Sequence, residues 1–299
     1  MTFSIIQVFV INLLLPIGFL IILWKAKVQS KLEWVTFLLT AWTVFIWLFL
    51  SGPWDWLSYY LRIIFPLLLI IVTFLSWRKI KHQEVKIESK SKHRLSVGIN
   101  LVLAFLFGMY STLSISGLFT SDDAIELNFP LQDGVYYVGQ GGSHEMINYH
   151  HAYEPQQYAL DVVKLNSLGT RASGIYPDEL EKYAIFGDNL YSPCEGNVVE
   201  TRDGLSDLIP PDSNPEQPEG NYVALQCEQS EAILYIAHMQ KGSISVEVDD
   251  AVTEETVIGK VGNSGNTSEP HLHIHAEKDG VGIPLKFNKR FLTRNGIIW

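Results

Sequence analysis

Long runs of apolar residues fill the first 120 positions of the chain, and only short runs follow them. Four of the long runs approach the ~20 residues that a helix needs to cross the ~30 Å apolar core of a bilayer. Each run is apolar on every face, unlike a helix at the surface of a water-soluble core. The pattern predicts an all-α transmembrane bundle of four helices over residues 1–119. The expected spans are Phe3–Trp24, Trp34–Leu50, Leu57–Trp77 and Leu95–Phe119.

The ends of the runs predict how the bundle sits in the membrane. The first run lacks a leading positive residue and a small-residue cleavage site, so we expect a span and not a cleaved signal peptide. The first loop carries Lys25, Lys27 and Lys31, and a dense run of Lys and Arg fills 78–94, whereas the loop around Ser51–Trp56 has neither. Because basic loops stay in the cytoplasm, we expect a multi-pass cell-membrane protein with both termini outside.

After Phe119, short β-type runs alternate with clusters of Gly, Pro, Asn and Asp, which predicts an extracytoplasmic, antiparallel all-β domain over residues 120–299. The expected strands are Gly134–Gly139, Tyr158–Lys164, Gly196–Arg202, Tyr222–Cys227, Ala232–His238, Val257–Val261 and His271–Ala276. Two long loops, Asn166–Asp188 and Asp203–Gly220, interrupt these strands. Within the first loop, Pro177–Ile185 is expected to form a short helix, with Pro at an early position.

Charge and cysteine content narrow the function of the second half. The 22 Lys and Arg residues are shared between the halves, but most of the 32 Asp and Glu residues follow residue 120. An acidic domain argues against nucleic acid as a partner, because a phosphate backbone needs a basic surface. Cys194 and Cys227 form either one bridge or two separate buried thiols. Since no CxxC pair exists, a thiolate zinc site is not expected.

Histidines and one aspartate carry the candidate chemistry. In Pro270–His275 three histidines alternate with apolar residues, so on a strand His271, His273 and His275 share one face. Asp161 stands inside an apolar strand, where a carboxylate is costly unless it is paired or binds a cation. His238 ends another apolar run. Zinc in enzymes takes three such ligands and leaves a fourth position open. The alternatives are a polar strand face, a turn aspartate and a core histidine.

The segment Tyr235–Ala276 resembles the lysostaphin/LytM-type family of zinc peptidases, which cut peptide cross-bridges in bacterial cell walls. The resemblance rests on Tyr235-x-x-His238, then Gly259–Asn266, then Pro270–His273, in this order. It extends more loosely back to about Gly139 and covers none of the membrane half.

The resemblance implies a LytM-type fold and a Zn²⁺-dependent endopeptidase that hydrolyses peptide bonds in peptidoglycan. In the family, an Asp and the second His of H-x-H bind zinc, which gives Asp161 and His273 here. The catalytic residues would be His238 and His271, which flank the zinc-bound water, orient it and stabilise the oxyanion.

The sequence departs from the family at the first zinc ligand. Gln157, four residues before Asp161, replaces the usual His. We expect His150 to take this role, because Asn148-x-His150 resembles a variant branch with a longer spacing, and His151 is the second candidate. Three further residues, His275, Asn148 and Tyr158, either support the site or have no part in it.

Two other functions stay open. A non-catalytic ectodomain could bind wall peptides and regulate another hydrolase, or it could signal through the membrane. The presence of Gln157 favours the non-catalytic ectodomain that regulates another hydrolase, whereas His238, His271 and His273 favour the enzyme.

Overall fold

The computed structural model describes residues 2–25, 28–82 and 86–299, so Lys27 of the first loop lies outside the described residues. The chain forms two compact units. The helical unit comprises Met1–Trp54 and Ser58–Ile115, and the β unit comprises Ser116–Trp299 together with Asp55–Leu57.

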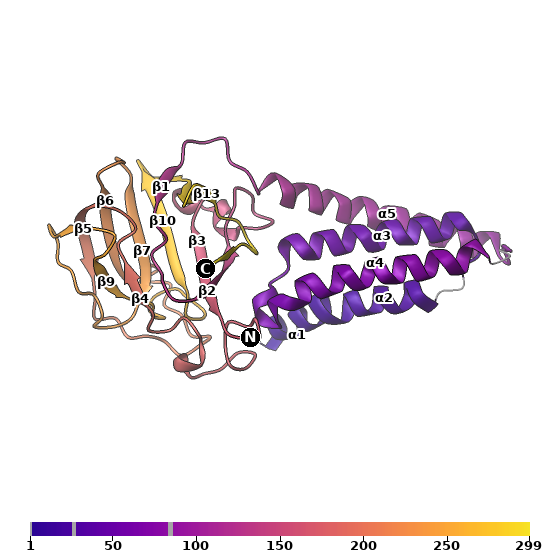
Figure 1. The fold of residues 1–299 in the computed structure, drawn as a ribbon, viewed down its shortest axis with the longest axis horizontal. Helices are drawn as coiled ribbons and strands as arrows, with labels where there is room; N and C mark the ends of the chain where they lie inside the picture. The colour runs from indigo at the N-terminus through magenta and orange to yellow at the C-terminus, as the bar shows by residue number, and fades with distance from the viewer. Residues whose placement is uncertain (1, 26–27, 83–85) are drawn as a thin grey trace. The chain divides into compact units, whose positions relative to one another are not determined.

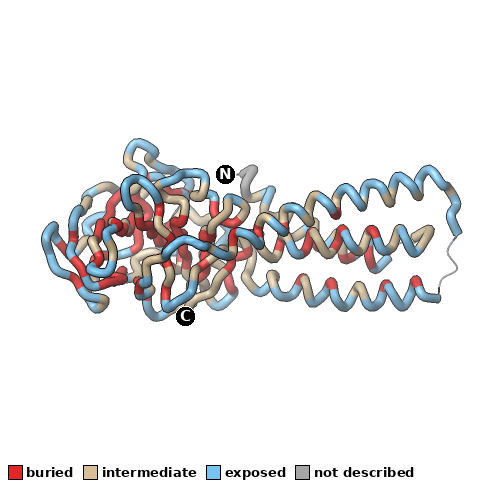
Figure 2. Tube along the Cα trace, turned by 90° about the horizontal axis from the view of Figure 1, so that it is seen from above, coloured by how far each residue is buried: buried red, intermediate tan, exposed pale blue. Residues whose placement is uncertain are grey.

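The helical unit consists of four long apolar helices, each long enough to cross a membrane (Figure 1). Large apolar side chains such as Leu67, Ile70 and Phe74 are exposed along them, and Figure 2 shows exposed positions along their whole length. Lipid would cover such a surface, so the helices indicate membrane insertion. The all-α prediction for this half is confirmed. The helices are α1 (Thr2–Phe9), continued through a π-helical turn (Val10–Leu14) into α2 (Leu15–Lys25), then α3 (Lys31–Ser51), α4 (Tyr59–Lys81) and α5 (Lys90–Ser116).

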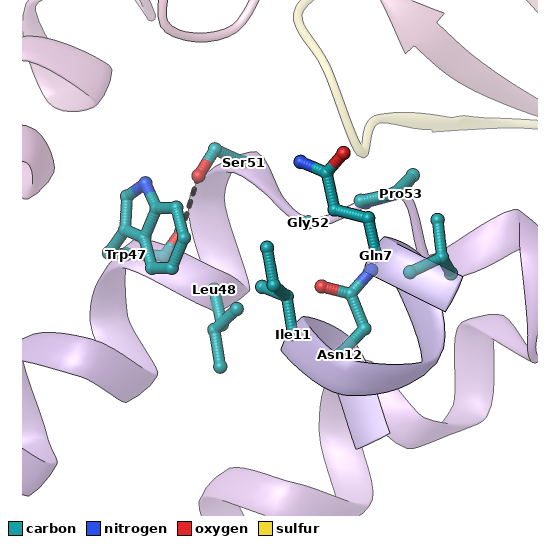
Figure 3. A pocket seen from close by; sticks show the side chains of 9 residues that line it. Gln7, Ile11, Asn12, Trp47, Leu48, Ser51, Gly52 and Pro53 are labelled. Atoms are coloured by element: carbon teal, nitrogen blue, oxygen red, sulfur yellow. Dashed lines mark hydrogen bonds between the residues drawn. The ribbon is translucent and has the colours of Figure 1, made fainter. Parts of the chain in front are cut away.

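A pocket of about 300 Å³ opens within the helical unit, between the first span and the end of α3 (Figure 3). Ile11 and Leu48 form part of its apolar lining. The amide nitrogen of Asn12 and the indole nitrogen of Trp47 are buried beside it and have no acceptor among the described residues. No charged side chain lines the pocket.

A nine-stranded sheet forms the centre of the β unit, with the order β14-β2-β3-β10-β7-β6-β5-β8 and β11 paired to β10. Its pairs are antiparallel, which confirms the mostly antiparallel β fold expected for this half. Its strands are β2 (Val135–Gln140), β3 (Leu160–Leu165), β5 (Gly196–Arg202), β6 (Asn221–Cys227), β7 (Ile233–Met239), β8 (Ala251–Val252), β10 (Leu272–Lys278), β11 (Val281–Ile283) and β14 (Ile297–Ile298).

Two small sheets complete this unit, and their buried side chains join its main hydrophobic core. One has the order β1-β12-β13, and the other pairs β4 with β9. These strands are β1 (Ile125–Leu127), β4 (Asn189–Tyr191), β9 (Val257–Lys260), β12 (Leu285–Phe287) and β13 (Arg290–Phe291). A disulfide joins Cys194 to Cys227 at the start of β5 and the end of β6.

The alternation along β10 separates the core from the site. Leu272 and Ile274 are buried in the main hydrophobic core, with exposed fractions of 0% and 1%. His273 and His275 therefore lie on the opposite face, as the period of a strand requires.

The prediction of a short helix over Pro177–Ile185 was wrong. Only a short 3₁₀ turn, Leu180–Lys182, forms there. Tyr183 pairs as a β-bridge with Ala172 and is buried, as is Ile185. The bridge at Tyr183 is followed by turns over residues 184–187, so the segment is irregular, and so short a helix would gain too few hydrogen bonds to offset its nucleation.

Candidate active site

Asp161 and His273 face each other across two paired strands. In the antiparallel β3–β10 pair, Asp161 stands directly opposite His273. His273 Nδ1 lies 2.9 Å from Asp161 Oδ1, and both residues are buried. The strand register therefore brings the two expected zinc ligands together from positions far apart in the sequence.

A short 3₁₀ turn, Tyr149–Ala152, places His150 at the same carboxylate. Its Nε2 lies 2.9 Å from Asp161 Oδ2. The fully buried Asn148 caps the turn: its side-chain oxygen accepts from the His150 backbone N–H, and its Nδ2 donates to the Gly142 and Ala159 carbonyls. Asn148 thus supports the site by fixing the turn that carries His150.

The second candidate for the first ligand, His151, contacts a different group. Its Nδ1 lies 3.2 Å from the Gln157 carbonyl oxygen. The Gln157 side chain in turn donates to the Gly282 carbonyl, and the Tyr158 hydroxyl donates to Asp122. Among the described residues, His151, Gln157 and Tyr158 belong to neither cluster of potential metal ligands.

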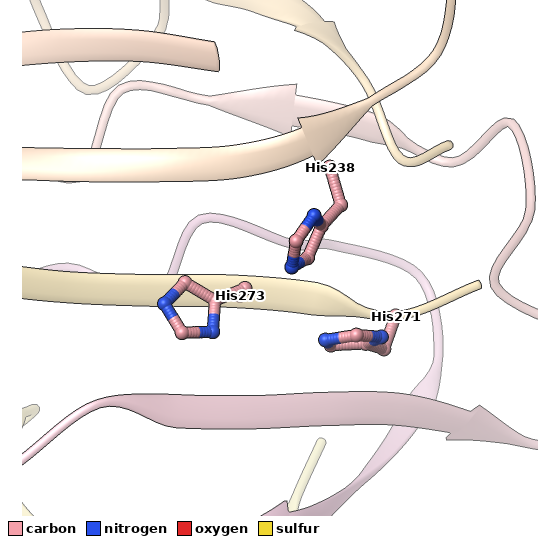
Figure 4. Close-up of side chains that lie close together, drawn as sticks. All are labelled: His238, His271 and His273. Carbon is pink, nitrogen blue, oxygen red and sulfur yellow. The ribbon is translucent and has the colours of Figure 1, made fainter. Parts of the chain in front are cut away.

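His238, near the end of β7, and His271, directly before β10, both lie close to His273 of β10 (Figure 4). His238 lies near the end of β7 with φ +59°, a backbone conformation that non-glycine residues seldom adopt. Its Nδ1 lies 2.9 Å from the Ser264 carbonyl oxygen, and His271 Nδ1 lies 2.8 Å from that of Glu269. Each Nδ1–H donates to a carbonyl, so in the neutral ring Nε2 keeps its lone pair.

The donor atoms form two overlapping clusters that fit a metal ion. His150, Asp161 and His273 offer ligand atoms that all lie within 4.8 Å of one another, and so do His238, His271 and His273. Two imidazoles and a carboxylate match the ligand types of catalytic zinc, so the first cluster fits the ion.

His275 completes the surroundings of His273. Its Nδ1 lies 3.0 Å from His273 Nε2, and its ring stacks on Tyr235 at 5.0 Å between centroids. If His273 Nδ1 holds a metal, the ring proton is on Nε2, and His275 Nδ1 can accept a hydrogen bond from it. Partners of this kind orient metal ligands, so His275 is a buried support and not an exposed residue.

Burial and mutual charge set the protonation of these groups. Burial alone would raise the pKa of Asp161, but the charges and hydrogen bonds of His150 and His271 hold it well below its usual value. Burial, with the positive charges of His271 and His273, lowers the pKa of His238 well below its usual value. Burial alone would also lower the pKa of His271, but the charge and hydrogen bond of the adjacent Asp161 raise the pKa of His271 above its usual value. His238 and His271 thus have opposite shifts, which suits a base and an acid.

The sequence did not point to two features of the site. The Tyr149 hydroxyl donates to Asp161 Oδ2 at 3.3 Å, and its ring lies 4.1 Å from that of His150. Arg171 and Glu269 form a buried ion pair beside His271. The position of Tyr149 next to the histidines was the only available signal, since Arg171 lies in a long loop without a motif.

A pocket of about 180 Å³ opens onto these residues. Tyr149, His150, His238 and His273 line it together with Glu219. The nitrogen atoms of the site are therefore accessible to a small group from outside.

Residues 182–284 match the model of peptidase family M23. This segment is a peptidase M23 domain. The M23 match includes His238, His271 and His273 but begins after His150 and Asp161, which join the site through the turn and strand described above. The chain shows no match to a curated protein.

Three solved structures illustrate the similarity. A zinc containing peptidase from Vibrio cholerae has 16% identity and a TM-score of 0.31, over 54% of this chain and 39% of that one. A putative peptidase M23 from Pseudomonas aeruginosa has 17% identity and a TM-score of 0.32, over 67% and 62%. The catalytic domain of lysostaphin from Staphylococcus simulans has 22% identity and a TM-score of 0.22, over 34% and 72%. The chain thus spans less than two thirds of the first two proteins' lengths.

Proposed function

We propose that the chain is a membrane-anchored zinc metalloendopeptidase that hydrolyses peptide bonds of cell-wall peptidoglycan. One observation carries the proposal: an M23 domain contributes His238, His271 and His273 to a buried cluster that Asp161 and His150 complete. Residues 1–119 would anchor the chain, and residues 120–299 would carry the site.

His150, Asp161 and His273 would hold the ion. Zinc, when bound, would lower the pKa of a water molecule and polarise the scissile carbonyl. The chain's own residues would do the rest. His238 is neutral at neutral pH because of its lowered pKa, so its Nε2 can accept a proton from the attacking water. His271, with its raised pKa, can donate a hydrogen bond to the developing oxyanion.

The charge pattern supports placing the M23 domain outside the cell. The basic segments around Lys31 and between Arg78 and Arg94 would stay in the cytoplasm, so the β unit would face the wall. Cysteine labelling tests this orientation in intact cells. A membrane-impermeant maleimide should label Ser213→Cys in the β unit and spare Ser91→Cys, both at exposed positions. The reverse pattern would contradict the proposed orientation.

Digestion of purified wall peptides tests the activity. The full chain in detergent should release new amine termini, a chelator should abolish the release, and added zinc should restore it. The His271→Ala variant, matched in purification, controls for contaminating hydrolases. A chain that binds one equivalent of zinc and wall peptides yet never cleaves them would instead be a binding module.

A further inference from the structure

A buried arginine joins three segments of the β unit that are distant in sequence. The Arg171 side chain is 1% exposed. Its Nε lies 2.7 Å from both carboxylate oxygens of Glu269 and 3.7 Å from Asp55 Oδ2. Its guanidinium lies 3.9 Å from the centroid of the Trp56 ring. A buried cation needs paired charges of this kind, so the three segments are held as one cluster.

The backbone adds to this link. The Arg171 N–H donates to the Asp55 carbonyl at 3.1 Å, and its Nη2 donates to the Ile175 carbonyl. Asp55 and Trp56 come from the short segment between α3 and α4, yet they belong to the β unit. The segment that links the second and third spans is therefore a structural part of the unit that carries the site.

Glu269 connects this cluster to His271. While its carboxylate binds Arg171, its carbonyl oxygen accepts from His271 Nδ1 at 2.8 Å and from the Thr267 hydroxyl at 2.9 Å. With one proton held at Nδ1, Nε2 is directed at the site, 3.4 Å from Asp161 Oδ1, and it carries the second proton when the ring is protonated. The orientation of the Glu269 peptide thus decides both the tautomer of His271 and the direction of its Nε2.

We propose that Asp55, Arg171 and Glu269 are positioning residues for His271, and that the segment between the second and third spans thereby forms part of the catalytic apparatus. Asp55 holds the guanidinium from one side and Trp56 covers its face. The guanidinium holds the carboxylate of Glu269, and the Glu269 carbonyl holds the imidazole. Because this role concerns catalysis by His271, it rests on the proposed peptidase function.

The test compares variants of the full chain in lipid nanodiscs. Asp55→Asn removes one charge at constant size, and Glu269→Gln weakens the contact to Arg171. Asp188→Asn is the matched control, because Asp188 forms a partly buried ion pair with Lys164 in the same unit, and this pair does not include Asp55, Arg171 or Glu269. Zinc content, kcat, KM and the pH profile of kcat/KM are measured on a purified wall peptide. Nitrogen-15 NMR of labelled histidine, assigned with His271→Gln, reports the tautomer.

We expect Asp55→Asn and Glu269→Gln to keep one equivalent of zinc and wild-type KM. Their kcat should fall about 10-fold, the loss expected for one hydrogen bond to a charged group. The limb of the pH profile that reports His271 should shift, and the Nδ1–H signal should broaden or move. Asp55→Glu, which keeps the charge, should recover part of kcat, whereas Asp188→Asn should match the wild type. A merely structural role would leave the pH profile and the tautomer unchanged.

The two proposals fail in different ways. If the wild type cleaves the peptide and Asp55→Asn has wild-type kcat, pH profile and His271 signal, the positioning role is overturned and the peptidase function stands. If the wild type binds zinc but cleaves nothing, the peptidase function fails, and the NMR signal alone decides whether Asp55 sets the tautomer. If Asp55→Asn does not fold, Glu269→Gln takes its place, and an unchanged kcat and pH profile there overturn the role.

Discussion

His273 stands directly opposite Asp161 in the β3–β10 pair, and its Nδ1 lies 2.9 Å from the carboxylate. Strand register thus fixes the distance between the two residues, which lie on rigid elements and not on loops. The third donor, His150, comes from a short turn beside them. The position of His150 is consequently the part of the cluster that a local change can disrupt most easily.

Replacing His150 and His151 one at a time should show which of these adjacent histidines is the first zinc ligand. We expect His150→Ala to lose the metal, because its Nε2 contacts Asp161, and His151→Ala to keep it, because its Nδ1 contacts the Gln157 carbonyl. Asp161→Ala and His273→Ala should also lose it. Elemental analysis of the purified full chain gives the zinc content per molecule. If His150→Ala kept zinc and His151→Ala lost it, the first ligand would be His151 and not His150.

His238 and His271 should affect turnover without affecting zinc content. His238→Ala removes the group that accepts a proton from water, and His271→Ala removes the group that donates a hydrogen bond to the oxyanion. We therefore expect each to lose ~10²–10⁴-fold in kcat. The measurement is steady-state cleavage of a wall peptide by enzyme of known zinc content. Loss of zinc from His271→Ala would instead make His271 a ligand, which the second donor cluster would accommodate.

The sequence predicted those parts of the site that depend on local patterns. Alternation along Pro270–His275 placed His273 and His275 opposite the buried Leu272 and Ile274, because a strand has a period of two. An apolar run around Asp161 similarly indicated a buried carboxylate. Both patterns are contained within a single strand, so each could be seen without knowing the fold.

The rest of the site depends on contacts that no local pattern records. The choice between His150 and His151 depends on the turn capped by Asn148, where a shift of one residue redirects the ring. The link from Asp55 through Arg171 to Glu269 joins three segments that only the tertiary structure brings together. Among the strands outside the main sheet, the expected strand Val257–Val261 appears as β9. The others, β1, β4, β12 and β13, were missed because two or three residues are too few to show alternation.

His275 should tune the affinity for zinc. His275→Phe keeps a ring to stack on Tyr235 but removes the nitrogen 3.0 Å from His273 Nε2. Loss of such a partner typically weakens metal binding by about 10–100-fold, and we expect that effect here. Competition with a chelating dye measures the affinity, and His151→Phe is the matched control. Equal affinities for the two variants would show that His275 only packs.

The zinc-free protein should be stabilised against unfolding by Asp161 and His271 over a limited range of pH. The folded pKa of Asp161 lies well below 3.8, the ordinary value of an aspartate, so its contribution to stability is present above pH 3.8 and is lost as the pH falls through the folded pKa. The folded pKa of His271 is raised above 6.5, the ordinary value of a histidine, so its contribution is present below pH 6.5 and is lost as the pH rises through the folded pKa. The two groups stabilise each other most between pH 3.8 and pH 6.5.

Thermal unfolding in chelator, followed by near-ultraviolet circular dichroism of the full chain, can measure this window. The midpoint difference between wild type and Asp161→Asn should be largest near pH 5, because Asp161 is charged there while His271 is still protonated. The difference should shrink as the pH rises through the folded pKa of His271, where that ring loses its proton, and also in strong acid, where Asp161 gains one. A difference that grows from pH 5 to pH 8 would mean that the charge of Asp161 does not stabilise the fold through His271.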